Sequence, residues 1–203
     1  RMKNPDKLTL IAGPCAIEDD EMPFIIGREV KAICDRLGID YIFKGSYRKA
    51  NRSRLDSFTG IGDDLALGIL QSVGKELGVE TITDVHESHE PEKVAKYVDN
   101  LQIPAFLCRQ TELLLAAGHT GCGVNIKKGQ FLSPEAMIFP LEKVRSTGND
   151  KVWLCERGTT FGYSDLIVDA TSISRMKELG APVIMDCTHA VQKPNKTEGV
   201  TGG

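Results

Sequence analysis

Seven short apolar segments recur along the 203-residue chain, and helical periodicity follows nearly all of them. The segments do not alternate between polar and apolar residues, so both faces of each are expected to be covered. The first run, at residues 7–16, is predicted as a strand that stops at a tight turn at Gly13-Pro14, with Cys15 just past the strand end. The other strands are predicted at residues 41–43, 80–85, 100–104, 123–127, 152–155 and 182–186. Strands that alternate with helices build a parallel sheet. The sequence therefore indicates an α/β protein.

The segments between the strands are predicted as helices at residues 22–37, 63–77, 91–97, 110–118, 134–146 and about 172–179. Gly38 and Gly78 are expected to end the first two helices as C-caps. A parallel sheet with such regular spacing is most often a (β/α)8 barrel, and we predict one TIM barrel catalytic domain over residues 1–203. The alternative, an open doubly wound sheet, normally carries a Gly-rich phosphate turn after its first strand, and residues 13–15 do not form one.

The chain is short for this fold, because barrels of this kind run to ~250 residues. It ends after the seventh predicted strand, in the polar and Gly-rich segment 193–203. Such a segment is typical of an active-site loop. We therefore expect that the C-terminal part of the barrel belongs to a longer gene product.

The charge balance argues against some classes of partner. A net charge of −3 does not favour a protein that coats nucleic acid or anionic membrane. No apolar run approaches the ~18 residues of a membrane span, so a cytoplasmic location is expected. The six cysteines are scattered without a CxxC pair, which indicates reduced thiols.

A local cluster of basic residues follows the second predicted strand. Lys44, Arg48, Lys49 and Arg52 lie within ten residues in a chain of net negative charge. In α/β folds the loops at the carboxyl ends of strands form the binding sites, so this segment is a candidate anion site. The alternative is a solvated basic loop, which is the commoner meaning of a charge run.

Other polar residues are expected beside this cluster at the mouth of the barrel. They follow the strand ends at Cys15, Lys44, Asp84, His86, Gln102, Lys127, Lys128, Glu156, Arg157, Asp186 and His189. Buried cations cost several kcal/mol unless they are paired. Two anionic groups, such as two phosphates or a phosphate and a carboxylate, would account for the cations in this ring. Cys15 and His189 could both bind a divalent metal of the Zn, Fe, Mn or Co type, but two ligands do not complete a metal site.

Several motifs together resemble the 3-deoxy-D-manno-octulosonate-8-phosphate synthases. The resemblance runs in order from about Leu8 to Gly203. The motifs are Ala12-Gly-Pro-Cys15, Lys49-Ala-Asn-Arg-Ser53, Thr83-Asp-Val-His-Glu87, Gln102-Ile-Pro-Ala-Phe-Leu-Cys-Arg-Gln110, Asn125-Ile-Lys-Lys-Gly-Gln-Phe131, Glu156-Arg-Gly-Thr-Thr-Phe-Gly-Tyr163 and Asp186-Cys-Thr-His-Ala-Val-Gln192.

The resemblance implies a transferase that condenses phosphoenolpyruvate with D-arabinose 5-phosphate and water for lipopolysaccharide synthesis. It implies a (β/α)8 barrel that usually forms a homotetramer. For phosphoenolpyruvate it implies binding by Lys44, Ser46, Gln102, Ala105, Lys127 and Arg157. For arabinose 5-phosphate it implies binding by Asn51, Arg52, Ser53 and, from a neighbouring subunit, Arg109. Near the reacting centre it places Lys49, Asp84 and His86.

The resemblance also bears on the metal. The family divides into metal-dependent members with cysteine after the first strand and metal-independent members with asparagine there. Cys15 therefore implies the metal-dependent class, with His189 as a second ligand. The two acidic residues that complete the metal site in that class lie beyond residue 203.

Two other functions remain open at this stage. A 3-deoxy-arabino-heptulosonate-7-phosphate synthase shares the Gly-Pro-Cys turn but usually has a different basic motif after the second strand. The chain could also be an inactive module that binds phosphosugars. Assays with erythrose 4-phosphate and arabinose 5-phosphate would separate the three possibilities.

Overall fold

Seven parallel strands form one sheet in the computed structural model, which describes residues 7–50, 55–56 and 58–193. The strands lie in the order β1-β2-β3-β4-β5-β6-β9, so each strand pairs with the next predicted strand along the chain. Their bounds are Thr9–Ala16 (β1), Asp40–Ser46 (β2), Glu80–Asp84 (β3), Asn100–Ile103 (β4), Gly123–Lys127 (β5), Val152–Glu156 (β6) and Val183–Met185 (β9). The predicted parallel α/β sheet of a TIM barrel is confirmed.

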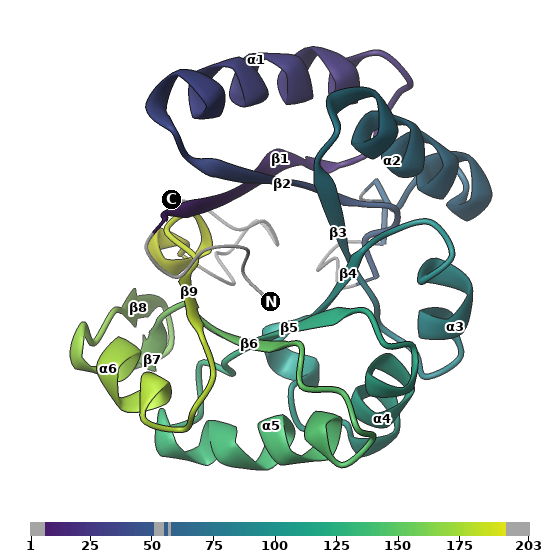
Figure 1. Cartoon of the computed structure of the whole chain (residues 1–203). Coiled ribbons are helices and arrows are strands. Elements are labelled where there is room, and N and C mark those ends of the chain that lie inside the picture. The colour runs from purple at the N-terminus through teal and green to yellow at the C-terminus, as the bar shows by residue number, and fades with distance from the viewer. Residues whose placement is uncertain (1–6, 51–54, 57, 194–203) are drawn as a thin grey trace.

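The sheet curls, and the helices cover its outer face (Figure 1). Gly38 and Gly78 end α1 and α2 with left-handed backbones, as predicted. The helix bounds are Met22–Leu37 (α1), Asp63–Leu77 (α2), Glu90–Val94 (α3), Thr111–His119 (α4), Ile138–Arg145 (α5) and Thr171–Lys177 (α6). Short 3-10 turns span Ala105–Leu107 (η1), Glu135–Met137 (η2) and His189–Val191 (η3). None of the described helices is both long and apolar enough to span a membrane.

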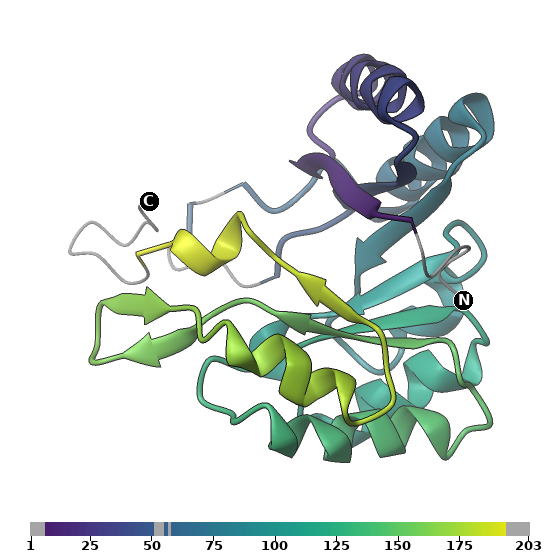
Figure 2. The same cartoon turned by 60° about the vertical axis from the view of Figure 1, so that its left-hand side comes forward.

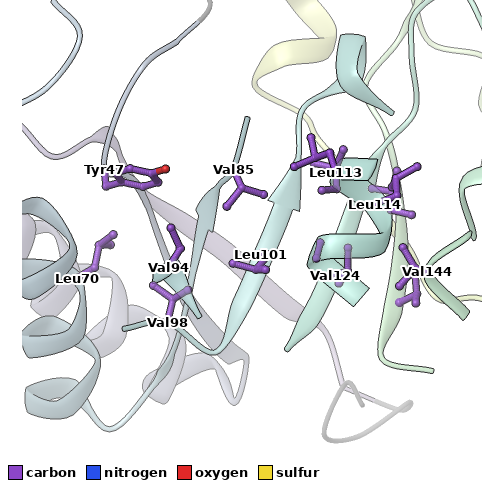
Figure 3. Close-up of a cluster of buried hydrophobic side chains, with 14 of the residues drawn as sticks. Tyr47, Leu70, Val85, Val94, Val98, Leu101, Leu113, Leu114, Val124 and Val144 are labelled. Carbon is purple, nitrogen blue, oxygen red and sulfur yellow. The ribbon is translucent and has the colours of Figure 1, made fainter. Parts of the chain in front are cut away.

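Alternation along the strands separates two apolar regions. Ile42, Ile82 and Trp153 point into the curl and form a small inner core with Ile11 and Ile184. The residues of opposite parity point outward and form the main core against the helices. Figure 3 shows part of this main core, including Leu70, Val94, Leu101, Leu114, Val124 and Val144. The inner face is therefore apolar toward the amino-terminal ends of the strands. Polar side chains occupy the part toward the carboxyl-terminal ends.

Strand β1 contains an irregularity that the sequence did not predict. The pairing register with β2 shifts between Ala12 and Cys15, and Cys15 adopts φ 65°. Cys15 thus lies within a bulged strand, and the expected strand end at residues 13–14 is wrong. Gly13 permits the bulge, because a Cβ there would lie 1.8 Å from the carbonyl oxygen of Lys44.

Two further differences concern element bounds. Strand β2 extends to Ser46, so Lys44 and Ser46 lie in the strand, not in the loop that follows it. An antiparallel hairpin of β7 (Thr159–Phe161) and β8 (Asp165–Ile167) was not predicted. This hairpin extends from the carboxyl-terminal end of the sheet (Figure 2). Its strands have three residues each and are largely exposed, so they carry no buried apolar pattern.

A cavity of about 470 Å³ lies between β1 and β9, the first and last strands of the sheet. Ile11, Ile42, Trp153 and Ile184 contribute to its wall. The cavity extends the inner apolar region toward the amino-terminal ends of the strands. The polar part of the inner face lies at the opposite end.

Candidate active site

Charged residues occupy the carboxyl-terminal part of the inner face. Lys44 on β2, Asp84 on β3 and Lys127 on β5 share the inward parity of Ile42 and Ile82. Cys15, Arg157 and Asp186 join them from β1 and from the segments after β6 and β9. The curl of the sheet brings these residues together, although they are far apart in the sequence.

Asp84 is the centre of the first group. Its Oδ2 accepts a short hydrogen bond from the Ser46 hydroxyl, and its Oδ1 accepts one from Gln102 Nε2. Lys44 Nζ lies 3.6 Å from Oδ2. Burial alone would raise the pKa of Asp84, but the charges of Lys44 and Lys49 outweigh it and hold this pKa well below its usual range. Asp84 is therefore a permanent carboxylate that fixes its neighbours.

Asp84 also sets the orientation of a row of amides. Because a carboxylate only accepts, Gln102 must turn its amide nitrogen to Asp84, and its Oε1 then accepts from Asn125 Nδ2 at 3.0 Å. Asn125 Oδ1 is buried and has no hydrogen-bond partner among the described residues. Sequence reasoning missed Asn125, although its inward parity with Lys127 could have identified it.

Lys49 links this group to β1. Its Nζ lies 2.9 Å from Ser46 Oγ and 3.2 Å from Cys15 Sγ. Since Ser46 donates its proton to Asp84, its oxygen accepts from Lys49. The next three predicted sugar-phosphate residues, Asn51, Arg52 and Ser53, lie outside the described residues.

Asp186 is the centre of the second group. Its carboxylate lies 2.5 Å from Lys127 Nζ and 2.8 Å from His189 Nδ1. Burial opposes ionisation of Asp186, but the hydrogen bond from His189 and the charge of Lys127 hold its pKa well below the usual range. Arg157 donates to the His189 carbonyl oxygen at 2.7 Å and to Gln192 Oε1 at 3.1 Å. The structure thus brings Lys127 and His189 together around one carboxylate, and Arg157 is joined to them through the backbone of His189.

Cys15 and His189 connect the two groups. A hydrogen bond between the thiol and the His189 ring, with the charges of Lys49 and Lys44, lowers the pKa of Cys15 to about 6 against the effect of burial. Asp186 holds His189 through Nδ1, so Nε2 is the ring nitrogen that a ligand could use. A thiolate beside a carboxylate-anchored imidazole is a donor pair that fits a divalent transition metal. Among the described residues no cluster of three or more metal-binding side chains is present.

Three other predicted residues lie apart from these groups. His86 packs beside Glu90, its Nδ1 lying 3.5 Å from Glu90 Oε2. Ala105 is buried as the first residue of η1. Arg109 is exposed, and its carbonyl oxygen accepts from Lys143.

Two members of the expected ring lie on the other face of the sheet, which corrects the prediction. Lys128 and Glu156 follow the outward parity of Ile126 and Leu154, and neither is exposed to solvent. Their charged atoms, Nζ and Oε1, lie 3.6 Å apart. They form a buried structural pair and do not belong to the candidate site.

The remaining inner cluster has an excess of positive charge. Lys44, Lys49, Lys127 and Arg157 stand against the carboxylates of Asp84 and Asp186 and the low-pKa thiol of Cys15. Burial lowers the pKa of Arg157, which indicates a guanidinium short of anionic partners. Such an arrangement can bind an anionic ligand that supplies the missing negative charge.

Comparisons with known proteins agree with this chemistry. Residues 3–201 match the model of the DAHP synthetase I family. A 2-dehydro-3-deoxyphosphooctonate aldolase of Bartonella bacilliformis is 50% identical over 98% of this chain and 71% of its own length. Proteins of the same name from Fusobacterium nucleatum and Acidithiobacillus ferrooxidans are 49% and 48% identical, over 97% and 96% of this chain and 71% and 69% of their own lengths.

Proposed function

The chain belongs to the DAHP synthetase I family, and from this we propose that it condenses phosphoenolpyruvate with D-arabinose 5-phosphate and water. The products are 3-deoxy-D-manno-octulosonate 8-phosphate and inorganic phosphate. The relatives at about half identity carry the name of this activity, 2-dehydro-3-deoxyphosphooctonate aldolase. The enzyme would thus be a transferase, 3-deoxy-8-phosphooctulonate synthase, of lipopolysaccharide synthesis.

The observation that carries this proposal is the uneven charge of the inner cluster. Phosphoenolpyruvate has a carboxylate and a phosphate, and both need cations that are fixed before the substrate arrives. Lys44, Lys127 and Arg157 are held by Asp84, Asp186 and the η3 backbone, so their positions are set without substrate. We assign them to phosphoenolpyruvate, together with Ser46, Gln102 and Ala105.

The reaction joins carbon 3 of phosphoenolpyruvate to the aldehyde carbon of the sugar phosphate. Water adds to carbon 2, and phosphate leaves by cleavage of its bond to that carbon. Negative charge develops on the aldehyde oxygen, and Lys49 is the cation best placed to donate a proton there, because Ser46 and Cys15 hold its Nζ. Fixing two anionic substrates in contact supplies several kcal/mol through proximity alone.

We further propose that Cys15 and His189 hold a divalent metal ion. A bound ion would supply positive charge for orienting the aldehyde. Asp186 anchors the His189 ring, and Lys49 and Lys44 favour the thiolate of Cys15. The lowered pKa of Cys15 favours the thiolate that metal binding requires. Asp186 orients the His189 ring but also raises its pKa, so a bound metal would displace a proton from His189.

The reaction is tested by measuring phosphate release from phosphoenolpyruvate with arabinose 5-phosphate or erythrose 4-phosphate. We expect release with arabinose 5-phosphate at a kcat/KM at least about tenfold higher. The second candidate is the heptulosonate reaction, which the description of the matched family favours. A preference for erythrose 4-phosphate would establish that candidate, and binding without release would indicate the inactive module.

The metal is tested on the same enzyme after dialysis against a chelator. Activity should fall to the background rate and return with Zn²⁺, Fe²⁺, Mn²⁺ or Co²⁺. Full activity in the chelated enzyme, with no metal found by elemental analysis, would refute the metal proposal without affecting the first. A homotetramer and a cytoplasmic location remain predictions, as does the contribution of Arg109 to a neighbouring site.

A further inference from the structure

We propose that Glu90 is a positioning residue for the aldose-phosphate half of the site. It lies at the start of α3, outside the cluster of charged residues on the inner face. The inference rests on the proposed function. It also rests on the prediction that the loop after β2 binds the sugar phosphate. Glu90 would act through the residues it holds and not by touching substrate.

The carboxylate of Glu90 is buried and binds three donors. Its Oε2 accepts from the Tyr47 hydroxyl at 2.7 Å and from the His86 backbone N–H at 2.8 Å. Its Oε1 accepts a short, charge-assisted bond from Arg48 Nη2. Burial would raise the pKa of Glu90, but its bonds with His86 and Tyr47 lower it to about 2. Glu90 is therefore charged and saturated with donors at neutral pH.

These donors come from two different loops. Tyr47 and Arg48 begin the loop after β2, and His86 lies in the loop after β3. Figure 3 shows the Tyr47 ring at about the same level as Val85, and both residues belong to the main core. A buried carboxylate shared by both loops fixes their separation, because releasing either one would leave a buried charge underpaired.

Further contacts fix the chain around Arg48, where the loop after β2 begins. Arg48 Nη1 lies 3.6 Å from Asp63 at the start of α2. The next residue, Lys49, donates its backbone N–H to the Thr59 carbonyl oxygen at 2.7 Å. Lys49 and Thr59 are thus joined immediately after the residue that Glu90 holds. The predicted sugar-phosphate residues 51–53 follow Lys49 in the sequence and lie outside the described residues.

The residues assigned to phosphoenolpyruvate are held by other partners. Lys44 and Gln102 contact Asp84, and Lys127 contacts Asp186. Loss of the Glu90 charge should therefore weaken one substrate far more than the other. A general distortion of the fold would weaken both.

The test compares Glu90→Gln with the wild-type enzyme. Glutamine keeps the shape of the side chain but removes the charge that Arg48 requires. We expect the Kd for arabinose 5-phosphate, measured by titration calorimetry with that substrate alone so that no turnover occurs, to rise about tenfold on loss of the charge-assisted contact. The Kd for phosphoenolpyruvate should change less than about twofold, and the KM values should show the same split.

Glu92→Gln is the matched control, because Glu92 lies in the same first turn of α3 but is exposed. It should leave both constants unchanged. Equal weakening of both substrates in Glu90→Gln, no weakening, or the same result in Glu92→Gln would each overturn the proposal. If Glu90→Gln does not fold, Arg48→Gln decides, since it removes the same contact and leaves Glu90 bonded to Tyr47 and His86. Absence of turnover in the wild type would refute the proposed reaction, whereas the two Kd values would still test Glu90.

Discussion

Lys127 and Lys128 are adjacent in the sequence, but they lie on opposite faces of the sheet and have different environments. Lys127 points into the curl and pairs with Asp186, in a cluster where cations outnumber carboxylates. Lys128 points outward and is saturated by Glu156, Thr159 and three carbonyl oxygens. A buried lysine is therefore a candidate ligand for an anion when its own partners leave positive charge unmatched.

The outer pair connects separate segments. Lys128 Nζ approaches the carbonyl oxygens of Leu132 and Gly158, and Glu156 accepts from the Gly158 N–H and the Ser172 hydroxyl. Burial lowers the pKa of Lys128 in spite of Glu156. This network holds the chain just after Lys127, the last residue of β5, and around Arg157, the first residue after β6. We infer that its role is structural, and four experiments test the contrast between the two faces.

Lys128→Met should have the largest effect. It leaves the Glu156 carboxylate buried without its cation, so the free energy of unfolding should fall by about 3–5 kcal/mol. Urea denaturation followed by circular dichroism measures this. Lys177→Met, at an exposed position of α6, should change it by less than about 0.5 kcal/mol. A loss below about 1 kcal/mol in Lys128→Met would refute the structural role.

Lys127→Met should act on catalysis. Removing a fixed cation from the reacting site should lower kcat/KM for phosphate release by about 10²–10³-fold, or roughly 3–4 kcal/mol. Its unfolding free energy should fall less than that of Lys128→Met, because Asp186 keeps its bond with His189. If activity stays above about a tenth of the wild-type value, the contrast between the two lysines fails.

Ser172→Ala tests the outer network more gently. Glu156 loses one of its donors inside the protein, which should cost about 1–3 kcal/mol of unfolding free energy. Ser174→Ala on the same helix is the control, since that hydroxyl is exposed and bonds only the Thr171 carbonyl oxygen among the described contacts. Equal stability of the two variants would show that Ser172 does not support Glu156.

The smallest expected effect concerns Cys15 on the inner face. With a pKa near 6, its thiol is mostly ionised at pH 7, so alkylation of the chelated enzyme by iodoacetamide should speed up less than about 1.2-fold from pH 7 to 8. Alkylation of a thiol with the ordinary pKa of 9.0 would speed up nearly tenfold over the same pH interval. Burial raises the pKa of Cys155 to about 12, so that residue should stay unmodified in the folded protein. Peptide mass spectrometry distinguishes the two cysteines.

The sequence predicted the sheet because the strands are continuous apolar runs in regular order. Its errors have physical causes. The hairpin β7–β8 was missed because its short exposed strands bury little apolar surface. The shift in β1 was missed because Gly13-Pro14 resembles a strand end, whereas the close approach of β2 keeps the chain in the sheet.

The sequence predicted the residue types of the candidate site, and it also contained the information that assigns some of these residues to a face of the sheet. Strand parity, continued from Val124 through Ile126, assigns Lys128 to the outer core by residue spacing alone. Lys127 pairs with Asp186, 59 residues away in the sequence, and Glu90 pairs with Arg48, 42 residues away. The curl of the sheet brings these residues together, and no local sequence pattern encodes that curl.

The left-handed backbone of Cys15 has an evolutionary consequence. A residue other than glycine at φ 65° costs ~1–3 kcal/mol, and asparagine adopts this conformation several-fold more often than most residues. Asparagine is also the residue that the resemblance gives to metal-independent members at this position. Replacement of this cysteine by asparagine in a lineage would therefore relieve backbone strain as the thiol is lost.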